Sequence, residues 1–461
     1  MHSQQNLPNG NKEQLHKSIS VQLRYLNYVC CLFLVFSLKA QEAENTPLSD
    51  SLNLYCFPDF ARIDSNLAKQ YPFIAIEKNN FQFYSVNSPN WEHLYHEFSD
   101  MITKKDRELH FYHIGGSHLQ ADIYTHDFRT FLQSNWEGIP GERGIVFPFN
   151  LAKTNNPANY KFSSPNTWTG YRSVNHRPQT IDYGLMGAAL VCRDSVINIT
   201  FKHNQTMVKP PFQAIRIYHN KGELPFELNF GADEILVYRM VQNLEYGYTD
   251  VYFTDPLNEL DVQFSRTTKE VLEFELYGLQ FMNGKPGISY TTIGVNGAGL
   301  YTYLDNINFE EQLKLYPPDF FAFSVGTNDG NVPYDRFDPQ VYKRNLEKMM
   351  QIVLRANPRC AILLTVPNDS YYKRKYLNRN IAREREVIIE LAEKYKMAVW
   401  DFYGIMGELG SSRLWQRNGL MQSDLVHFTS MGYHLKGDLL IDAFLKYMDQ
   451  MKKIDELKHA N

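Results

Sequence analysis

The chain has 461 residues, of which 43% are hydrophobic, 21% charged and 14% aromatic. This composition excludes a disordered, collagen-like or coiled-coil protein, and the length suffices for about three domains. Lys and Arg number 47 against 51 Asp and Glu, which gives a net charge of -4. Because no basic excess is available to neutralise a phosphate backbone, we expect no nucleic acid partner.

Residues 1–40 have the order of a secretion signal. Basic residues precede an apolar run, Tyr25–Leu38, which ends just before Ala40. This run of about 14 residues is too short to cross a hydrocarbon core and matches the apolar part of a signal peptide. We therefore expect cleavage near Ala40 and an exported protein, periplasmic or secreted, with no stable membrane insertion afterwards. An uncleaved N-terminal anchor is the alternative.

From residue 88 the sequence predicts an alternation of helices and strands. Ser88 followed by Pro89 is typical of a helix start, and apolar residues follow at helical spacing. A strand is predicted at Leu109–Ile114 and a helix at Asp122–Gln133. Between them lies Gly115-Gly116-Ser117, which places a serine where a strand gives way to a helix.

The same alternation returns in the last third of the chain. Near-continuous apolar strands separated by amphipathic helices are typical of a parallel sheet covered on both faces. We therefore predict a three-layer α/β/α domain. The expected elements are strands at 320–325, 361–366 and 397–402, and helices at 340–356, 377–395 and 429–451.

Residues 165–280 have a different, all-β pattern, with short apolar runs separated by turn residues at about ten-residue intervals. Ser117 and Gly297 stand 180 positions apart, whereas a strand-helix-strand unit needs about 30 or more. The surplus has the size of a domain, so we predict a β-sandwich inserted into the α/β domain. The expected division is 1–40 signal peptide, 41–87 N-terminal cover or linker, 88–160 first part of the α/β domain, 161–285 inserted domain and 286–461 second part.

Three short stretches offer the parts of an acyl-transfer site. Ser117 ends a predicted parallel strand, where backbone N–H groups at the start of a helix can stabilise negative charge. Asn328 follows another buried strand and can direct its amide to the same crevice. Asp424 and His427 can reach the serine together, because the carboxylate can hold one ring nitrogen while the other takes the serine proton. Taken singly, each stretch also fits an ordinary loop or turn.

In chain order, four stretches resemble the sequence blocks of the SGNH (GDSL-type) hydrolase superfamily: Gly115–His118, Gly294–Ala298, Gly326–Asp329 and Asp424–His427. The layout is most similar to bacterial peptidoglycan O-acetylesterases, in which a β-rich, carbohydrate-binding-like module is inserted after the serine block. The resemblance implies an SGNH-type α/β/α domain with serine esterase activity.

The resemblance also implies roles for individual residues. Ser117 matches the nucleophile, His427 the general base and Asp424 the acid that orients it. The implied oxyanion donors are the backbone N–H groups of Ser117 and Gly297 and the side chain of Asn328. Donors of this kind contribute about 10²- to 10³-fold each to the rate.

Three further residues are candidates for supporting roles. Gly116 stands where the family usually has Asp, which alters the turn before the nucleophile. Asp329 follows the implied oxyanion donor, and His118 either lines the substrate or packs the turn. The histidines near Ser117 do not predict a metal site, because His110 and His113 are an odd number apart on a strand and point to opposite faces. We expect no metal and no cofactor.

The sequence favours a secreted serine esterase that removes O-acetyl groups from a carbohydrate polymer such as peptidoglycan through an acyl-serine intermediate. Its partner is then an acetylated glycan or a small acyl ester, and transfer to a glycan instead of water is chemically compatible. One alternative is an esterase or lipase for small acyl esters. Another is a catalytically decayed glycan-binding protein, with a sugar-stacking platform formed by Tyr160, Trp168, Tyr171 and Tyr183. The sequence carries no signal of an oligomeric state.

Overall fold

The computed structural model describes residues 65–175, 181–231, 237–270 and 273–460. The expected signal peptide at 1–40 and its alternative, an uncleaved anchor, lie outside these residues. Within the described ranges, no helix combines the length and the apolar composition that a membrane span requires.

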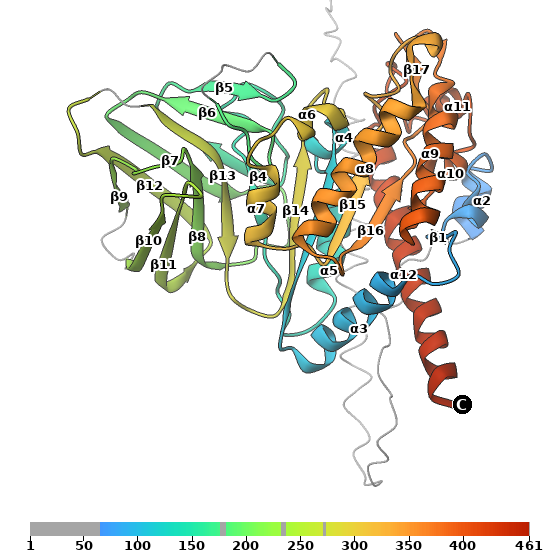
Figure 1. The fold of residues 1–461 in the computed structure, drawn as a ribbon, viewed down its shortest axis with the longest axis horizontal. Helices are drawn as coiled ribbons and strands as arrows, with labels where there is room; N and C mark the ends of the chain where they lie inside the picture. Colours follow the sequence, from blue (N-terminus) through green and yellow to red (C-terminus); the bar gives the residue numbers. More distant parts are fainter. Residues whose placement is uncertain (1–64, 176–180, 232–236, 271–272, 461) are drawn as a thin grey trace, which may run out of the picture. The chain divides into compact units, whose positions relative to one another are not determined.

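A six-stranded sheet forms the centre of the α/β part, with the strand order β1-β19-β16-β15-β2-β14 (Figure 1). All neighbouring pairs are parallel except β1 and β19, which are antiparallel. Gly115 of β2 lies opposite Gly294 of β14 and Ser324 of β15, so three strands end in one row. The strands are β1 (Gln82–Phe83), β2 (Glu108–Gly115), β14 (Gly287–Gly294), β15 (Phe320–Ser324), β16 (Ala361–Thr365) and β19 (Ala398–Trp400).

Helices cover both faces of this sheet (Figure 1). On β15, Phe320 and Ala322 pack with α3, α5, α10, α11 and α12, whereas Phe321 and Phe323 pack with α6, α7, α8 and α9. This alternation follows from the two-residue period of a strand. The helices are α2 (Ser65–Gln70), α3 (Pro89–Lys104), α4 (Ser117–Gln120), α5 (Tyr124–Ser134), α6 (Leu300–Leu304), α7 (Phe309–Leu315), α8 (Pro339–Ala356), α9 (Asn380–Tyr395), α10 (Phe402–Met406), α11 (Ser411–Arg417) and α12 (Ser430–Ala460).

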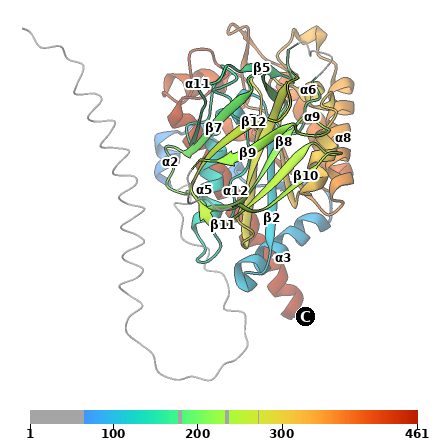
Figure 2. The ribbon, with the colours of Figure 1, turned by 90° about the vertical axis from the view of Figure 1, so that its left-hand side faces the viewer.

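The strands of the β-rich region form two antiparallel sheets (Figure 2), one with the order β10-β11-β8-β13-β6-β5 and β3 paired to β13, the other with the order β4-β7-β12-β9. Aromatic rings pack between them, with the centroids of Phe201 on β7 and Phe281 on β13 4.2 Å apart. The strands are β3 (Gly144–Val146), β4 (Tyr160–Ser163), β5 (Thr169–Arg172), β6 (Ala188–Cys192), β7 (Val196–His203), β8 (Phe212–His219), β9 (Phe226–Phe230), β10 (Val237–Asn243), β11 (Tyr248–Leu257), β12 (Glu259–Arg266) and β13 (Phe274–Met282). The predicted fold class, an α/β/α domain interrupted by a β-sandwich, is confirmed.

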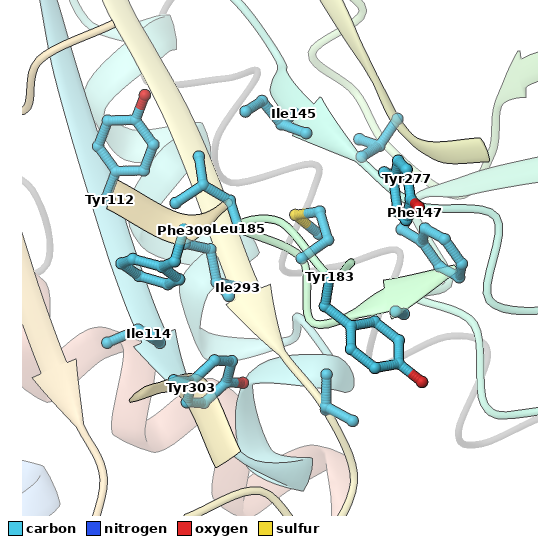
Figure 3. Packing of buried hydrophobic residues seen from close by; sticks show 14 of the residues in the cluster. Tyr112, Ile114, Ile145, Phe147, Tyr183, Leu185, Tyr277, Ile293, Tyr303 and Phe309 are labelled. Atoms are coloured by element: carbon cyan, nitrogen blue, oxygen red, sulfur yellow. The ribbon is translucent and has the colours of Figure 1, made fainter. Parts of the chain in front are cut away.

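The sandwich and the parallel sheet share one buried core. Tyr112 and Ile114 on β2 and Ile293 on β14 belong to the same cluster as Ile145 on β3 and Tyr277 on β13 (Figure 3). Burial of such side chains stabilises by about 1.5–3 kcal/mol each. The β-rich region is therefore packed against the α/β part through a common core at β14 and β2.

Several predicted boundaries differ from those observed. The boundary expected at 160/161 falls inside β4, and β3 at 144–146 already pairs with the sandwich strand β13, so the β-rich region begins earlier. A three-residue strand shows too little alternation to be recognised in sequence. The strand expected at 397–402 ends at Trp400 because the Asp401 side chain accepts a hydrogen bond from Gly404 N and caps α10.

Candidate active site

Ser117 is the first residue of α4, directly after β2 and Gly116. The sequence placed the following helix at 122–133, whereas the structure has a short helix from the serine itself and a second, α5, from Tyr124. Asp122, with φ of 45°, separates the two helices. The serine is thus held at the carboxyl end of a central parallel strand, in the row where β14 and β15 also end.

Ser117, His427 and Asp424 form a continuous hydrogen-bonded chain. Ser117 Oγ lies 2.8 Å from His427 Nε2, and His427 Nδ1 lies 2.7 Å from Asp424 Oδ2. The imidazole is about one third exposed, so a substrate can reach the Oγ–Nε2 pair from solvent. A proton can pass from the hydroxyl to the ring while the carboxylate stabilises the resulting imidazolium.

The loop before α12 holds the carboxylate in place. Asp424 Oδ1 accepts hydrogen bonds of 3.0 Å from the backbone N–H groups of Val426 and His427. Partial burial alone would raise the pKa of Asp424, but these bonds and the one from the His427 ring outweigh it and hold that pKa below its usual value. Asp424 therefore stays ionised and accepts the hydrogen bond that the ring N–H of His427 donates.

The three stretches expected to supply oxyanion donors converge beside Ser117. Asn328 Nδ2 donates to Ala298 O over 2.9 Å, which joins the loop after β15 to the loop after β14. Gly297 has a φ of 87° and is exposed, with open space where a Cβ would stand. The Asn328 amide has a second N–H, so the bond to Ala298 leaves one proton for another acceptor.

Gly116 makes room for this arrangement. A Cβ at position 116 would stand 2.7 Å from Asn328 Nδ2 and 3.2 Å from Ala298 O. Any larger residue there would displace the Asn328 amide. The absence of Asp at this position, noted in the sequence, is matched by the close approach of Asn328 to the glycine.

Gln120 connects the same elements, although no sequence motif distinguishes it. Its side-chain oxygen accepts a 2.6 Å hydrogen bond from Asn296 N, and its Nε2 donates to Asn155 O. At Gly294 a Cβ would stand 2.2 Å from Gln120 N, so glycine is required for α4 to pack on the end of β14. The position of Gln120 three residues after the serine, on the same short helix, is the signal that could have identified it.

His118 packs against the imidazole of His427 and is not exposed. Its ring centroid is 5.2 Å from that of His427, its Nδ1 bonds to Tyr433 Oη over 2.8 Å, and the side chain is buried. Burial, the charge of Lys436 and that of His427 hold the pKa of His118 well below its usual value, so the ring stays neutral.

Lys436 is a buried amine close to this ring. The rings of Tyr124, Trp400, Phe402 and Phe428 surround its Nζ, the nearest centroid being that of Phe402 at 4.4 Å. Burial lowers the pKa of Lys436 to about 7. Nothing in the sequence distinguished this lysine from those on the surface.

Asp329 supports the loops without touching the serine. Its Oδ1 accepts a 3.0 Å hydrogen bond from Leu300 N at the start of α6. Burial raises the pKa of Asp329 to about 6, despite the backbone hydrogen bonds that favour its charged form. The neighbouring Glu384 is fully buried, and burial raises its pKa further, well above the usual range.

The other expectations concern histidines and aromatic residues. His113 is buried and bonds to Tyr290 Oη and Ser324 Oγ, whereas His110 bonds to Pro317 O. Within the described residues, no three His, Cys, Asp or Glu side chains gather in a way that could hold a metal ion. Three of the four suggested platform residues are buried and serve as packing, namely Tyr160, Trp168 and Tyr183, while Tyr171 is half-buried.

Comparisons with known proteins agree with this geometry. Residues 276–435 match the GDSL-like Lipase/Acylhydrolase family, a range that contains Gly297, Asn328, Asp424 and His427 but not Ser117. A search of curated proteins finds no match. A solved peptidoglycan O-acetylesterase shares the fold, with a TM-score of 0.66 and 18% identity over 80% of this chain and 99% of the other.

Two other solved structures match a smaller part of the chain. A lipase/acylhydrolase from Enterococcus faecalis is 21% identical over 34% of this chain and 74% of its own, with a TM-score of 0.27. An acetylxylan esterase from Geobacillus stearothermophilus is 21% identical over 35% of this chain and 73% of its own, also with a TM-score of 0.27. The family match thus covers about a third of the chain, and the fold, an α/β/α domain of the SGNH type with a β-rich region built into it, is shared with the solved O-acetylesterase.

Proposed function

We propose that the chain is an exported esterase that removes O-acetyl groups from a carbohydrate polymer, with peptidoglycan as the foremost candidate, and that Ser117 is its nucleophile. The observation that carries this proposal is the chain of hydrogen bonds from Ser117 Oγ through His427 to Asp424. The fold shared with a peptidoglycan O-acetylesterase supports the choice of polymer. Residues 1–40 are then the signal peptide that directs export.

The chemistry follows from the positions of these groups. Ser117 Oγ attacks the acetyl carbonyl while His427 Nε2 takes the hydroxyl proton, and a C–O bond forms as the carbonyl π bond breaks. The N–H groups of Ser117 and Gly297 and the Asn328 amide stabilise the oxyanion. His427 then gives its proton to the departing sugar oxygen, which leaves an acetyl-serine. Water, deprotonated by His427, releases acetate and restores the serine.

We assign residues 88–143 and 286–461 to the hydrolase part and 144–285 to the inserted module, because β3 and β4 pair with strands of the sandwich. Residues 41–87 are assigned as an N-terminal cover or linker, of which β1 pairs with the sheet edge at β19. No cofactor enters the reaction.

The test is acetate release from O-acetylated peptidoglycan. Ser117→Ala should lower the rate by about 10³-fold or more, because only binding and the oxyanion donors remain. Ser134→Ala, at the exposed end of α5, is the matched control and should retain the wild-type rate. Equal acetate release by wild type and Ser117→Ala would disprove the proposal.

Two further measurements separate the alternatives. A fluorophosphonate probe should label Ser117, and retention of peptidoglycan without labelling would instead indicate a decayed glycan-binding protein. A series of nitrophenyl esters of increasing chain length should be hydrolysed fastest at acetate. A maximum at longer chains would indicate an esterase or lipase for small acyl esters.

A further inference from the structure

Two segments beside the catalytic loop are strongly basic, although the whole chain has more acidic than basic residues. They cover residues 370–383 and 409–423 and contain no Asp or Glu. Their seven basic residues are Lys373, Arg374, Lys375, Arg379, Arg383, Arg413 and Arg417.

Three of these cations stand at the tip of a small hairpin. The hairpin consists of β17 (Tyr371–Tyr372) and β18 (Tyr376–Leu377), and Lys373, Arg374 and Lys375 connect the two strands. All three side chains are exposed, and none takes part in the ion pairs formed among the described residues. Their charges are therefore available to a ligand in solution.

The hairpin is attached to the loop that carries Asp424 and His427. Tyr371 N donates to Leu425 O over 3.1 Å, and Asn368 Nδ2 donates to Val426 O over 3.3 Å. In the chain, Leu425 and Val426 are the two residues between the acid and the base. The hairpin therefore begins directly beside the proton relay.

The second basic segment is fixed to the same place. The buried carboxylate of Asp369 accepts hydrogen bonds from Gly410 N, Ser412 N and Ser412 Oγ. The guanidinium of Arg413 lies 5.0 Å from the ring centroid of Tyr371. Figure 1 shows β17 and α11 at the same end of the α/β part as α4, the helix that Ser117 begins. The hairpin and the first turn of α11 thus lie beside the loop that carries Asp424 and His427.

Exposed aromatic surface accompanies these charges. Tyr376 is 54% exposed, and the Nζ of Lys375 lies 5.3 Å from its ring centroid. An exposed ring can stack on the apolar face of a sugar, while Lys and Arg attract carboxylate or phosphate groups. Each exposed charge pair contributes little free energy of binding in water. Several such pairs close together add, and the positive charges also steer an anionic polymer toward Ser117.

We infer that the hairpin β17–β18, with Arg379 and Arg413 beside it, is a subsite for negatively charged groups of the substrate, so that the esterase acts on acetylated anionic polysaccharides. This inference rests on the proposed function and narrows its substrate class. The net charge of the chain does not indicate this preference for anionic substrates, because acidic residues elsewhere in the sequence outnumber the basic ones of the hairpin.

The test compares how fast the same protein deacetylates two polymers. One is chemically O-acetylated polygalacturonate, which is acidic, and the other is O-acetylated xylan, which is neutral. The triple variant Lys373→Gln, Arg374→Gln, Lys375→Gln should raise KM for the acidic polymer by about tenfold, because three cations that would pair with the carboxylates of the bound polymer are lost. The ratio of kcat/KM between acidic and neutral polymer should fall accordingly. The wild-type ratio should also fall as NaCl is raised from 50 to 500 mM, because exposed charges are screened.

The matched control removes three lysines at the C-terminal end of α12, at the other end of the α/β part from β17 (Figure 1). Lys452→Gln, Lys453→Gln, Lys458→Gln changes the net charge equally and should leave the ratio at its wild-type value. An unchanged ratio in the hairpin variant, with an unchanged melting temperature, would overturn the inference. The inference would also be overturned if the hairpin variant lost binding to phosphatidylglycerol vesicles while its ratio of kcat/KM between the two polymers stayed unchanged. That result would assign the hairpin to a membrane surface.

A binding measurement separates this inference from the proposed function. Affinity electrophoresis of the Ser117→Ala protein in gels with unacetylated polygalacturonate needs no catalysis. The hairpin variant in that background should be retarded less than its parent. Weaker retardation of the hairpin variant supports the subsite even if the wild-type protein releases no acetate. Equal retardation of the two proteins refutes the subsite.

Discussion

Gln120 and Asn296 are joined by a 2.6 Å hydrogen bond from the backbone N–H of Asn296 to the side-chain oxygen of Gln120. This bond ties the helix that Ser117 begins to the loop that carries Gly297. The two proposed oxyanion N–H groups therefore have a common support. Gln120 acts through the loop and is a positioning residue.

We expect Gln120→Ala to lower kcat for p-nitrophenyl acetate by about 10- to 100-fold with little change in KM, because the Gly297 N–H loses its alignment with the developing oxyanion. Steady-state kinetics check this. Gln213→Ala, a surface glutamine on β8 of the sandwich, is the control. A change in KM alone would assign Gln120 to substrate binding instead.

Gly116→Ala should impair catalysis although it adds only a methyl group. The new Cβ would stand 2.7 Å from Asn328 Nδ2 and move that amide. We expect kcat to fall by about 10²-fold, the usual effect of losing one oxyanion donor. In the double variant with Asn328→Ala the losses should not add, since both act on the same group.

The control for Gly116→Ala is Gly231→Ala in the sandwich, where the nearest atom to the new Cβ is a side-chain oxygen of Asp261 at 3.1 Å. It should keep the wild-type kcat. Full additivity of Gly116→Ala and Asn328→Ala would show that the glycine acts on something other than the amide.

Asp122→Asn should destabilise the protein strongly. The buried carboxylate of Asp122 pairs with Arg129 at 2.9 Å and Arg143 at 3.1 Å, and both guanidinium groups are buried with it. Loss of the charge leaves two buried cations unpaired, which costs about 3–5 kcal/mol in the free energy of unfolding. Urea unfolding at pH 7 measures it. Asp100→Asn, at a half-buried surface carboxylate that pairs with Lys104 and Arg107, should cost less, about 1 kcal/mol.

Lys436→Met should change how stability depends on pH. Burial lowers the pKa of Lys436 from 10.5 to about 7, so between these values the unfolded chain binds a proton that the folded protein does not. The contribution of this group to stability therefore rises as the pH increases from about 7 to 10.5.

At pH 6 the folded wild type must bury the cation, so Lys436→Met should be more stable by about 1–4 kcal/mol, and the difference should shrink by pH 10. Urea unfolding at both pH values measures it. Lys453→Met, on the exposed face of α12, should show the same difference from wild type at both. A constant difference for Lys436→Met would mean that the amine is charged, or neutral, throughout.

Much of the α/β part could be predicted because its signals are local. The helix predicted at 340–356 is observed at 339–356, since Asp338 caps it and Pro339 begins it. Its apolar positions, from Tyr342 to Val353, all face the core. The order of the four blocks led to Ser117, Asn328, Asp424 and His427, whose mutual distances no single block could have shown.

The residues missed by sequence reasoning act through contacts between distant segments. Gln120 is identified only by its bond to Asn296, 176 positions later. Lys436 is unusual only because four rings from three parts of the chain surround it. The hairpin at 371–377 was invisible because each of its strands has two residues, too few for a periodic pattern.

The pairing of β2 with β14 also sets an order of events during synthesis. The strand that precedes Ser117 has both its sheet neighbours, β14 and β15, more than 170 residues downstream. Until the ribosome has released residue 294, β2 has two open edges, and one stays open until residue 324 is released; unpaired edges favour aggregation. The strands of the sandwich are synthesised after β2 and before β14, and they can pair among themselves. They can therefore present a folded, apolar surface to β2 before the parallel sheet forms.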